Sequence, residues 1–157
     1  MHMDIVSKST RRRMMQAVRR RGTGIELAVR KIVRSLGLRY RVNPRGLPGT
    51  PDLSNQRGCW AIFVHGCFWH GHPNCIKTRS GPHGKIPVSN SDFWTKKIEG
   101  NRRRDSVKAN ALRQKGFRVL TVWECEIRQE QALRQRLAKF LRCDCDAPES
   151  SRMGERV

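Results

Sequence analysis

The sequence predicts an α/β fold in which a small mixed β-sheet is flanked by helices. Two compact apolar runs, residues 59–64 and 117–123, have the composition of buried strands. Two other segments, residues 23–36 and 133–141, place their apolar residues at helical spacing. Because helical and strand segments follow one another along the chain, we expect helices packed on a sheet rather than an all-helical or all-strand fold.

Two helices are expected at the start of the chain. Ser9 or Thr10 can cap a short helix within a basic arm, residues 8–22. Thr23 and Glu26 have the spacing of a capping box, so a second helix begins there and ends at Gly37.

The middle of the chain alternates between strands and turns. We expect a weak strand at residues 38–42, a turn-rich segment at 44–51 and the buried strand at 59–64. Residues 66–90 are rich in Gly, Pro and His and show no period. A loop this long needs support other than a hydrophobic core, and a metal ion is one such support.

The last third predicts a polar helix, a strand and an amphipathic helix. The polar helix runs from Ser91 to about Gln114, the strand spans residues 117–123, and the final helix reaches residue 141. We therefore expect one domain over residues 1–142 and a flexible tail over 143–157.

The charge of the chain indicates a polyanionic partner. There are 33 Lys and Arg against 13 Asp and Glu, a net charge of +20 and an isoelectric point near 11.2. Neutralising DNA phosphates releases counterions, which favours binding by a basic protein. The basic residues are spread along the chain rather than set against one large apolar helix face, so nucleic acid is expected and a membrane is not.

The first ten residues have no apolar core, so we expect a cytoplasmic, nucleoid-associated protein. In that compartment the six cysteines would stay reduced or bind metal rather than form disulfides. We expect Cys59 to lie in the core. Cys143 and Cys145 are interpreted as free thiols, with half of a second metal site as the alternative.

Residues 63–75 concentrate histidine, cysteine and aromatic side chains. Cys67, His72 and Cys75 can supply three zinc ligands within nine residues, and Cys125 can supply a fourth from beyond the strand at 117–123. His70 can replace His72 in this set, and each cysteine taken alone can be an ordinary buried side chain.

A candidate catalytic pair precedes this segment. Asp52 follows a turn, and the next strand delivers His65. Restriction-endonuclease-like nucleases place an Asp at one strand end and an acid-x-Lys sequence on the next strand. Here that sequence corresponds to Phe63, Val64 and His65, so the acid is lost and His replaces Lys. Pro-Asp by itself also begins ordinary turns.

Four motifs occur together and in order: Leu-Pro-Gly-Thr-Pro-Asp at 47–52, Phe-Val-His-Gly-Cys-Phe-Trp-His at 63–70, Asp-Phe-Trp-x-x-Lys-Ile at 92–98 and Val-Trp-Glu-Cys at 122–125. From about Ser9 to Leu141 the chain resembles the very-short-patch repair (Vsr) DNA mismatch endonucleases. The resemblance implies a restriction-endonuclease-like fold with a zinc-stapled loop. It also implies Mg²⁺-dependent nicking of duplex DNA 5′ to the T of a T:G mismatch produced by deamination of 5-methylcytosine.

The resemblance also implies roles for individual residues. Mg²⁺ would bind Asp52 and the backbone carbonyl of Val64, and Zn²⁺ would bind Cys67, His72, Cys75 and Cys125. The catalytic residues would be Asp52, His65, His70, Glu26 and Asp105, with Asp105 orienting a histidine. Two simpler interpretations remain: Glu26 can be only a helix cap, and Asp105 can pair with the arginines at 102–104 on a solvated helix face.

The resemblance further implies that aromatic side chains enter the DNA. The intercalating residues would be Phe68, Trp69, Trp94 and Met15, and the arm at 8–22 would clamp phosphates. Core packing is an equal alternative for Trp94, and Met15 at helical spacing can also be a core residue.

Family members act as monomers, and a monomer is expected here; any mismatch-repair or methyltransferase partner is left open. Two alternative functions remain: a restriction-like or structure-specific nuclease, and a non-catalytic zinc-stabilised DNA-binding module.

Overall fold

The structure is a computed structural model that describes residues 9, 10, 13, 22–73, 75 and 91–142. Several expectations lie outside these residues: most of the basic arm, Met15, the second half of the loop at 66–90, and the tail with Cys143 and Cys145. Within the described residues, no helix has both the length and the apolar character needed to cross a membrane.

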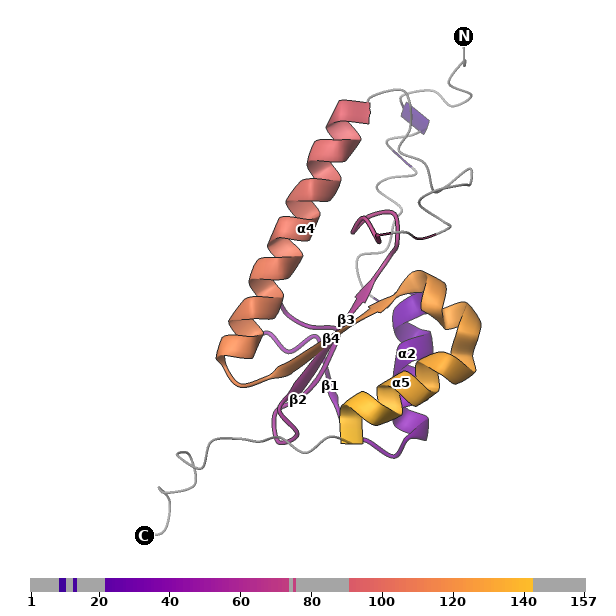
Figure 1. Cartoon of the computed structure of the whole chain (residues 1–157), viewed down its shortest axis with the longest axis vertical. Coiled ribbons are helices and arrows are strands. Elements are labelled where there is room, and N and C mark those ends of the chain that lie inside the picture. The colour runs from indigo at the N-terminus through magenta and orange to yellow at the C-terminus, as the bar shows by residue number, and fades with distance from the viewer. Residues whose placement is uncertain (1–8, 11–12, 14–21, 74, 76–90, 143–157) are drawn as a thin grey trace.

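A four-stranded mixed sheet forms the centre of the fold (Figure 1). Its strands are β1 (Arg41–Val42), β2 (Leu53–Asn55), β3 (Trp60–His65) and β4 (Arg118–Trp123), and they lie in that order across the sheet. β1 with β2 and β2 with β3 pair antiparallel, whereas β3 and β4 pair parallel. The predicted small mixed sheet is confirmed.

Strand β3 is buried along its whole length. Its side chains alternate between two cores, as a period of two requires. Trp60, Ile62 and Val64 belong to the larger core, and Ala61 and Phe63 to the smaller one. A strand buried on both faces needs covering layers on both sides, which explains why its sequence is apolar throughout.

Helices supply these layers. Figure 1 shows α4 (Ser91–Gln114) on one side of the sheet and α2 (Gly24–Ser35) with α5 (Glu130–Arg142) on the other. Leu112 of α4 fills the smaller core, while α2 and α5 contribute side chains to the larger one. The predicted helices flanking the sheet are therefore present.

The start of α2 has the predicted cap at Thr23, although the Glu26 carboxylate bonds the residue before the N-cap and not Thr23 N–H. The Glu26 backbone N–H donates to the Thr23 hydroxyl at 3.4 Å, and the Glu26 carboxylate accepts from the Gly22 N–H at 2.9 Å. Gly37, with φ of 76°, follows the helix in the left-handed region that favours glycine.

Three elements differ from the prediction. The strand expected at residues 38–42 is only Arg41–Val42. β2 was not expected, because Leu53–Asn55 is too short to show an alternating pattern, and its pairing with β3 decides its conformation. A 3₁₀ helix, η1 (Glu124–Gln129), connects β4 to α5. Cys59, expected in the core, lies before β3 in a positive-φ turn and is partly exposed.

Candidate active site and metal centre

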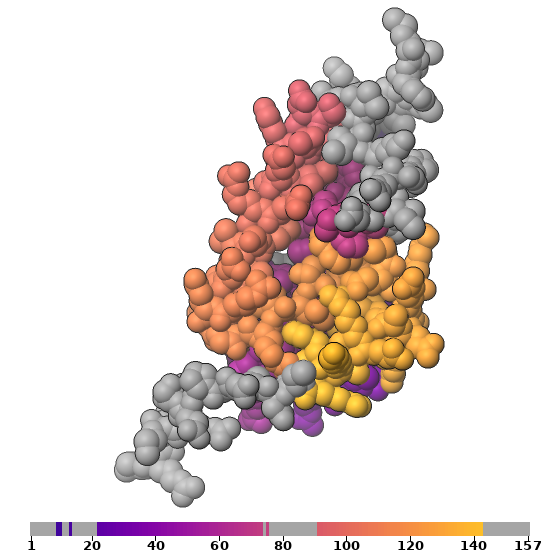
Figure 2. Space-filling model, in the orientation of Figure 1, coloured from indigo at the N-terminus to yellow at the C-terminus, as the bar shows by residue number. Residues whose placement is uncertain are grey.

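The parallel pairing of β3 and β4 brings the candidate residues to one edge of the sheet. His65, the last residue of β3, is in register with Trp123, the last residue of β4. The segments that follow, residues 66–75 and η1, therefore start side by side. In Figure 2 the segment after β3 lies against α4.

The first cluster contains the four expected zinc ligands. The ligand atoms of Cys67, His72, Cys75 and Cys125 all lie within 4.8 Å of one another. The Nδ1 atom of His72 is 3.6 Å from the Cys67 sulfur and 3.4 Å from the Cys125 sulfur. In a tetrahedral zinc site, bonds of about 2.3 Å to sulfur and about 2.0 Å to nitrogen put these atoms about 3.5 Å apart. The cluster therefore fits a tetrahedral metal ion.

Burial sets the protonation of this cluster in the absence of metal. It raises the pKa of Cys67 to about 12 and also raises the pKa of Cys125, so both remain thiols at neutral pH. Burial lowers the pKa of His72, which leaves its imidazole neutral. Metal binding would deprotonate the thiols, whereas Nδ1 of a neutral imidazole can already bind.

Asp52 lies just before β2, next to buried Pro51. Its Oδ2 atom accepts a hydrogen bond from the Val64 backbone N–H at 2.7 Å. Burial, with a smaller contribution from the charge of Glu26, raises the pKa of Asp52 to about 6 despite that hydrogen bond and the opposing charges of Arg30 and His70. A cation would stabilise the ionised form of this half-buried carboxylate. The backbone carbonyl of Val64 is a second ligand type that Mg²⁺ accepts.

Glu26 is a helix cap with a buried carboxylate. It is only 4% exposed and accepts hydrogen bonds from Gly22 N–H at 2.9 Å, the Thr23 hydroxyl at 3.0 Å and Arg30 at 3.0 Å. Its charge also acts on Asp52. Glu26 therefore caps α2 and also contributes negative charge at Asp52.

The second cluster contains His65, His70 and Asp105. The two imidazoles are stacked, with centroids 3.9 Å apart and planes at 7°. Nδ1 of His70 is 2.5 Å from Oδ2 of Asp105, and Nε2 of His65 is 4.0 Å from Oδ1. An ionised carboxylate only accepts hydrogen bonds, so His70 donates from Nδ1 and its Nε2 is left for another partner.

Burial and neighbouring charges fix the protonation of this cluster. Burial, with repulsion from His70, lowers the pKa of His65 to about 4 despite the opposing charge of Asp105. Burial alone would raise the pKa of Asp105, but its hydrogen bond to His70 and the surrounding positive charge outweigh that effect and lower it. At neutral pH the His65 imidazole is therefore neutral and the Asp105 carboxylate is ionised.

This second cluster does not fit a single metal ion as it stands. Its ligand atoms also lie within 4.8 Å of one another. An imidazole binds metal in its own ring plane, and one ion cannot lie in both planes of a stacked pair. The arrangement is suited to holding and moving protons.

Aromatic side chains gather beside these clusters. Phe68 and Trp69 contact Trp94 of α4, with ring centroids 5.4 Å and 5.9 Å away. The ammonium group of Lys97 lies 5.6 Å from the Trp69 ring and 5.4 Å from the Trp94 ring. All three predicted aromatic residues are partly exposed, so none of them is fully buried in the core.

Helix α4 holds the segment after β3 by contacts that the sequence interpretation missed. Asn101 donates to the Trp69 carbonyl at 2.7 Å, one helical turn before Asp105. Gly71, with φ of 59°, lies so close to α4 that a Cβ atom would be 2.5 Å from Ile98 Cγ2. One turn after Asp105, Lys108 contributes positive charge to the histidine pair. Ile98, Asn101, Asp105 and Lys108 are spaced three to four residues apart, which places them on one face of α4. This spacing is the sequence signal that these four residues act at the same place.

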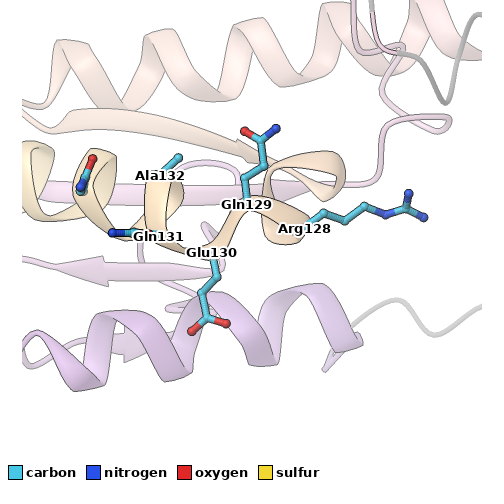
Figure 3. A pocket seen from close by; sticks show the side chains of 6 residues that line it. Arg128, Gln129, Glu130, Gln131 and Ala132 are labelled. Carbon is cyan, nitrogen blue, oxygen red and sulfur yellow. The ribbon is translucent and has the colours of Figure 1, made fainter.

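A surface hollow contains none of the residues of the two clusters. It is at the start of α5 and is lined by Arg128, Gln129, Glu130, Gln131, Ala132 and Gln135 (Figure 3). No histidine, cysteine or buried carboxylate lines it, so it does not compete with the two clusters as a catalytic site.

Comparisons with known proteins agree with this chemistry. The family described as "DNA mismatch endonuclease Vsr" matches residues 3–77. The chain is 44% identical over 138 residues to the type II nicking enzyme V.XorIIP of Xanthomonas oryzae, covering 88% of this chain and 96% of that protein. It is 39% identical over 139 residues to the type II nicking enzyme V.NmeAIP of Neisseria meningitidis, covering 88% and 94%. It is 36% identical over 143 residues to the DNA mismatch endonuclease Vsr of Escherichia coli, covering 88% and 87%. A buried carboxylate, a histidine pair and a metal-ligand cluster thus lie at one sheet edge in a chain that belongs to the Vsr family of DNA mismatch endonucleases.

Proposed function

We propose that this endonuclease nicks duplex DNA 5′ to the T of a T:G mismatch, by Mg²⁺-dependent hydrolysis, in very-short-patch repair. The main support is the half-buried Asp52 carboxylate, which interacts electrostatically with His70 of the histidine pair. The relatives named as nicking enzymes and as a mismatch endonuclease support the same reaction. We further propose that the chain acts as a monomer in the cytoplasm, where its DNA substrate lies.

The proposed catalytic residues divide the work of phosphodiester hydrolysis. Bound to Asp52 and the Val64 carbonyl, Mg²⁺ would neutralise phosphate charge and lower the pKa of a bound water. The hydrogen bond from Val64 N–H holds one oxygen of Asp52 and leaves the other for the cation. Glu26 adds a buried carboxylate whose charge acts on Asp52.

The histidines handle protons. His65, with a pKa of about 4, is neutral at physiological pH and can accept a hydrogen bond from water. Asp105 fixes the tautomer of His70, so that Nε2 is available to the phosphate or the leaving oxygen. The negative charge of Asp105 stabilises a protonated His70 when a proton is transferred.

We propose Zn²⁺ for the cluster of Cys67, His72, Cys75 and Cys125. Three sulfurs and one imidazole nitrogen are a common closed set for structural zinc. Three ligands, Cys67, His72 and Cys75, come from the segment after β3, and Cys125 comes from η1. The ion would therefore fasten this segment to the end of β4.

The partly exposed aromatic residues support intercalation. Phe68, Trp69 and Trp94 contact one another beside the histidine pair, and we propose that they enter the base stack together with Met15. A mismatched pair costs less to unstack than a matched one, which would favour entry at T:G. The basic arm at 8–22 would hold phosphates without reading sequence.

The test uses end-labelled duplexes that carry T:G or the parental C:G pair, incubated with the protein and Mg²⁺. We expect one nick, 5′ to the mismatched T, and no nick in an Asp52→Asn variant. Cutting of both duplexes would favour a general nuclease, and tight binding without cutting would favour a binding module. Equal cutting by Asp52→Asn would contradict the proposed mechanism.

A further inference from the structure

Trp123 lies between the two clusters and contacts a histidine from each. Its indole ring is stacked on His72 of the metal cluster, with centroids 4.2 Å apart and planes at 9°. The same indole meets His65 of the histidine pair nearly edge-on, at 5.4 Å and 74°. One aromatic side chain therefore separates a candidate zinc ligand from a candidate catalytic residue.

The backbone of Trp123 is held firmly in place. It is the last residue of β4 and is in parallel register with His65. Its N–H donates to the Glu126 carboxylate at 2.7 Å, which fixes the turn into η1. Two residues later, Cys125 belongs to the metal cluster. The indole thus has little freedom to move away from either histidine.

We infer that Trp123 is a positioning residue that couples the metal centre to His65. An ion bound at Nδ1 of His72 fixes the plane of that ring, and the stacked indole follows that plane. The T-shaped contact with the indole in turn limits the space that His65 occupies. The metal centre therefore sets the position of His65 as well as holding the loop. This inference rests on the roles proposed above for His65 and for zinc.

A residue that only fills space would behave differently from a coupling residue. Trp123→Leu removes both ring contacts, whereas Trp123→Phe keeps an aromatic ring to stack on His72 and to meet His65 at a steep angle. Leu137→Ala is the matched control, because it truncates a fully buried side chain of α5 in the larger core, which does not contain Trp123. Each variant is compared with the full-length parent protein loaded with zinc.

Three measurements test the inference. The first is the rate of zinc loss to a chromophoric chelator, and the second is the NMR signal of the His65 ring. The third is the single-turnover nicking rate on the T:G duplex at saturating protein, with zinc content and DNA affinity measured on the same samples. For Trp123→Leu we expect zinc loss at least about 10-fold faster, a shifted His65 signal and nicking about 10-fold to 100-fold slower with unchanged DNA affinity. Trp123→Phe should restore all three, and Leu137→Ala should leave them within about threefold of the parent.

The outcomes separate the inference from the proposed function. If Trp123→Leu changes the rate of zinc loss but leaves the His65 signal unchanged, the inference is wrong. It is also wrong if Leu137→Ala changes both to the same extent as Trp123→Leu. If the parent does not nick the T:G duplex, the proposed function fails, while zinc loss and the His65 signal still decide the coupling. If Trp123→Leu does not fold, Trp123→Met replaces it, because its flexible side chain fills the space without a ring.

Discussion

The His70 imidazole and the Asp105 carboxylate form a 2.5 Å hydrogen bond across 35 positions of sequence. His70 lies on the segment after β3, and Asp105 lies on α4 on one side of the sheet. The pair resembles the orienting carboxylate and histidine of many hydrolytic sites, in which the carboxylate selects the tautomer and stabilises the charged ring.

Replacing Asp105 by Asn should slow nicking strongly. The amide can still accept from Nδ1 of His70, but it cannot balance the charge of a protonated ring. We expect the single-turnover rate on a T:G duplex to fall about 100-fold or more, with DNA binding retained. The control is Glu99→Gln, which removes one negative charge from an exposed position of the same helix. Equal losses in both variants would mean that charge on α4, rather than the contact to His70, is responsible.

Asp52→Asn should abolish nicking and yet stabilise the metal-free protein. The pKa of Asp52 is raised from 3.8 to about 6, so the stability associated with its protonated form is complete below pH 3.8 and is lost as pH rises through 6. The amide stays neutral and keeps an acceptor for Val64 N–H. Above pH 6 we expect the free energy of unfolding to increase by about 1–3 kcal/mol, measured by urea denaturation in EDTA.

Two comparisons test that explanation of Asp52→Asn. Asp92→Asn, which changes an exposed carboxylate, should leave the free energy of unfolding within about 0.5 kcal/mol of the parent. Mg²⁺ should stabilise the parent and not Asp52→Asn. A stabilisation of Asp52→Asn that persists at pH 4 would contradict the argument, because Asp52 is largely protonated there.

Local patterns explain which parts of the fold could be predicted. The apolar run of β3 and the capping box at Thr23 and Glu26 are short-range signals, and both elements formed as expected. β2 carried no such signal, because Leu53–Asn55 has too few residues to show a period and owes its conformation to pairing with β3.

The site was predictable in its residue types but not in its geometry. Spacing alone left either His70 or His72 as the partner of the cysteines. The structure places His72 beside Cys125 and His70 beside Asp105. Both partners are more than thirty positions away along the chain, so only the tertiary fold separates the two histidines. The contact of Trp123 with His65 likewise depends on strand register.

Removing a ligand of the metal cluster should lower the thermal stability of the protein, because the proposed role of this metal ion is structural. We expect one zinc ion per chain in the parent and loss of zinc in Cys125→Ser. Because two segments are then no longer joined, the thermal midpoint should fall by about 10 °C, measured by circular dichroism. Cys59→Ser is the control, since Cys59 lies outside the cluster and should keep both zinc and midpoint. Full zinc content in Cys125→Ser would remove Cys125 from the ligand set.

Trp69→Ala should reduce mismatch recognition rather than general DNA binding. Loss of a stacking ring removes the contact with unstacked bases but leaves the phosphate contacts intact. We expect affinity for a T:G duplex to fall about 10-fold to 100-fold and affinity for the C:G parent to stay within about threefold, by fluorescence anisotropy at fixed salt. Val107→Ala, at a position of α4 that is 64% exposed, should change neither. Equal weakening on both duplexes would indicate a role in fixing the loop rather than in entering the DNA.

Glu26→Gln separates helix capping from catalysis in one side chain. The glutamine oxygen can accept from Gly22 N–H and Arg30, and its amide can donate to the Thr23 hydroxyl, so the cap stays satisfied. Only the negative charge near Asp52 is lost. We expect the free energy of unfolding to stay within about 1 kcal/mol of the parent and nicking to slow at least about 10-fold. Glu26→Ala, which also removes the cap, should lose stability as well, by about 1–2 kcal/mol. A Glu26→Gln protein that nicks as fast as the parent would leave Glu26 with a capping role alone and assign the cation to Asp52 and the Val64 carbonyl without it.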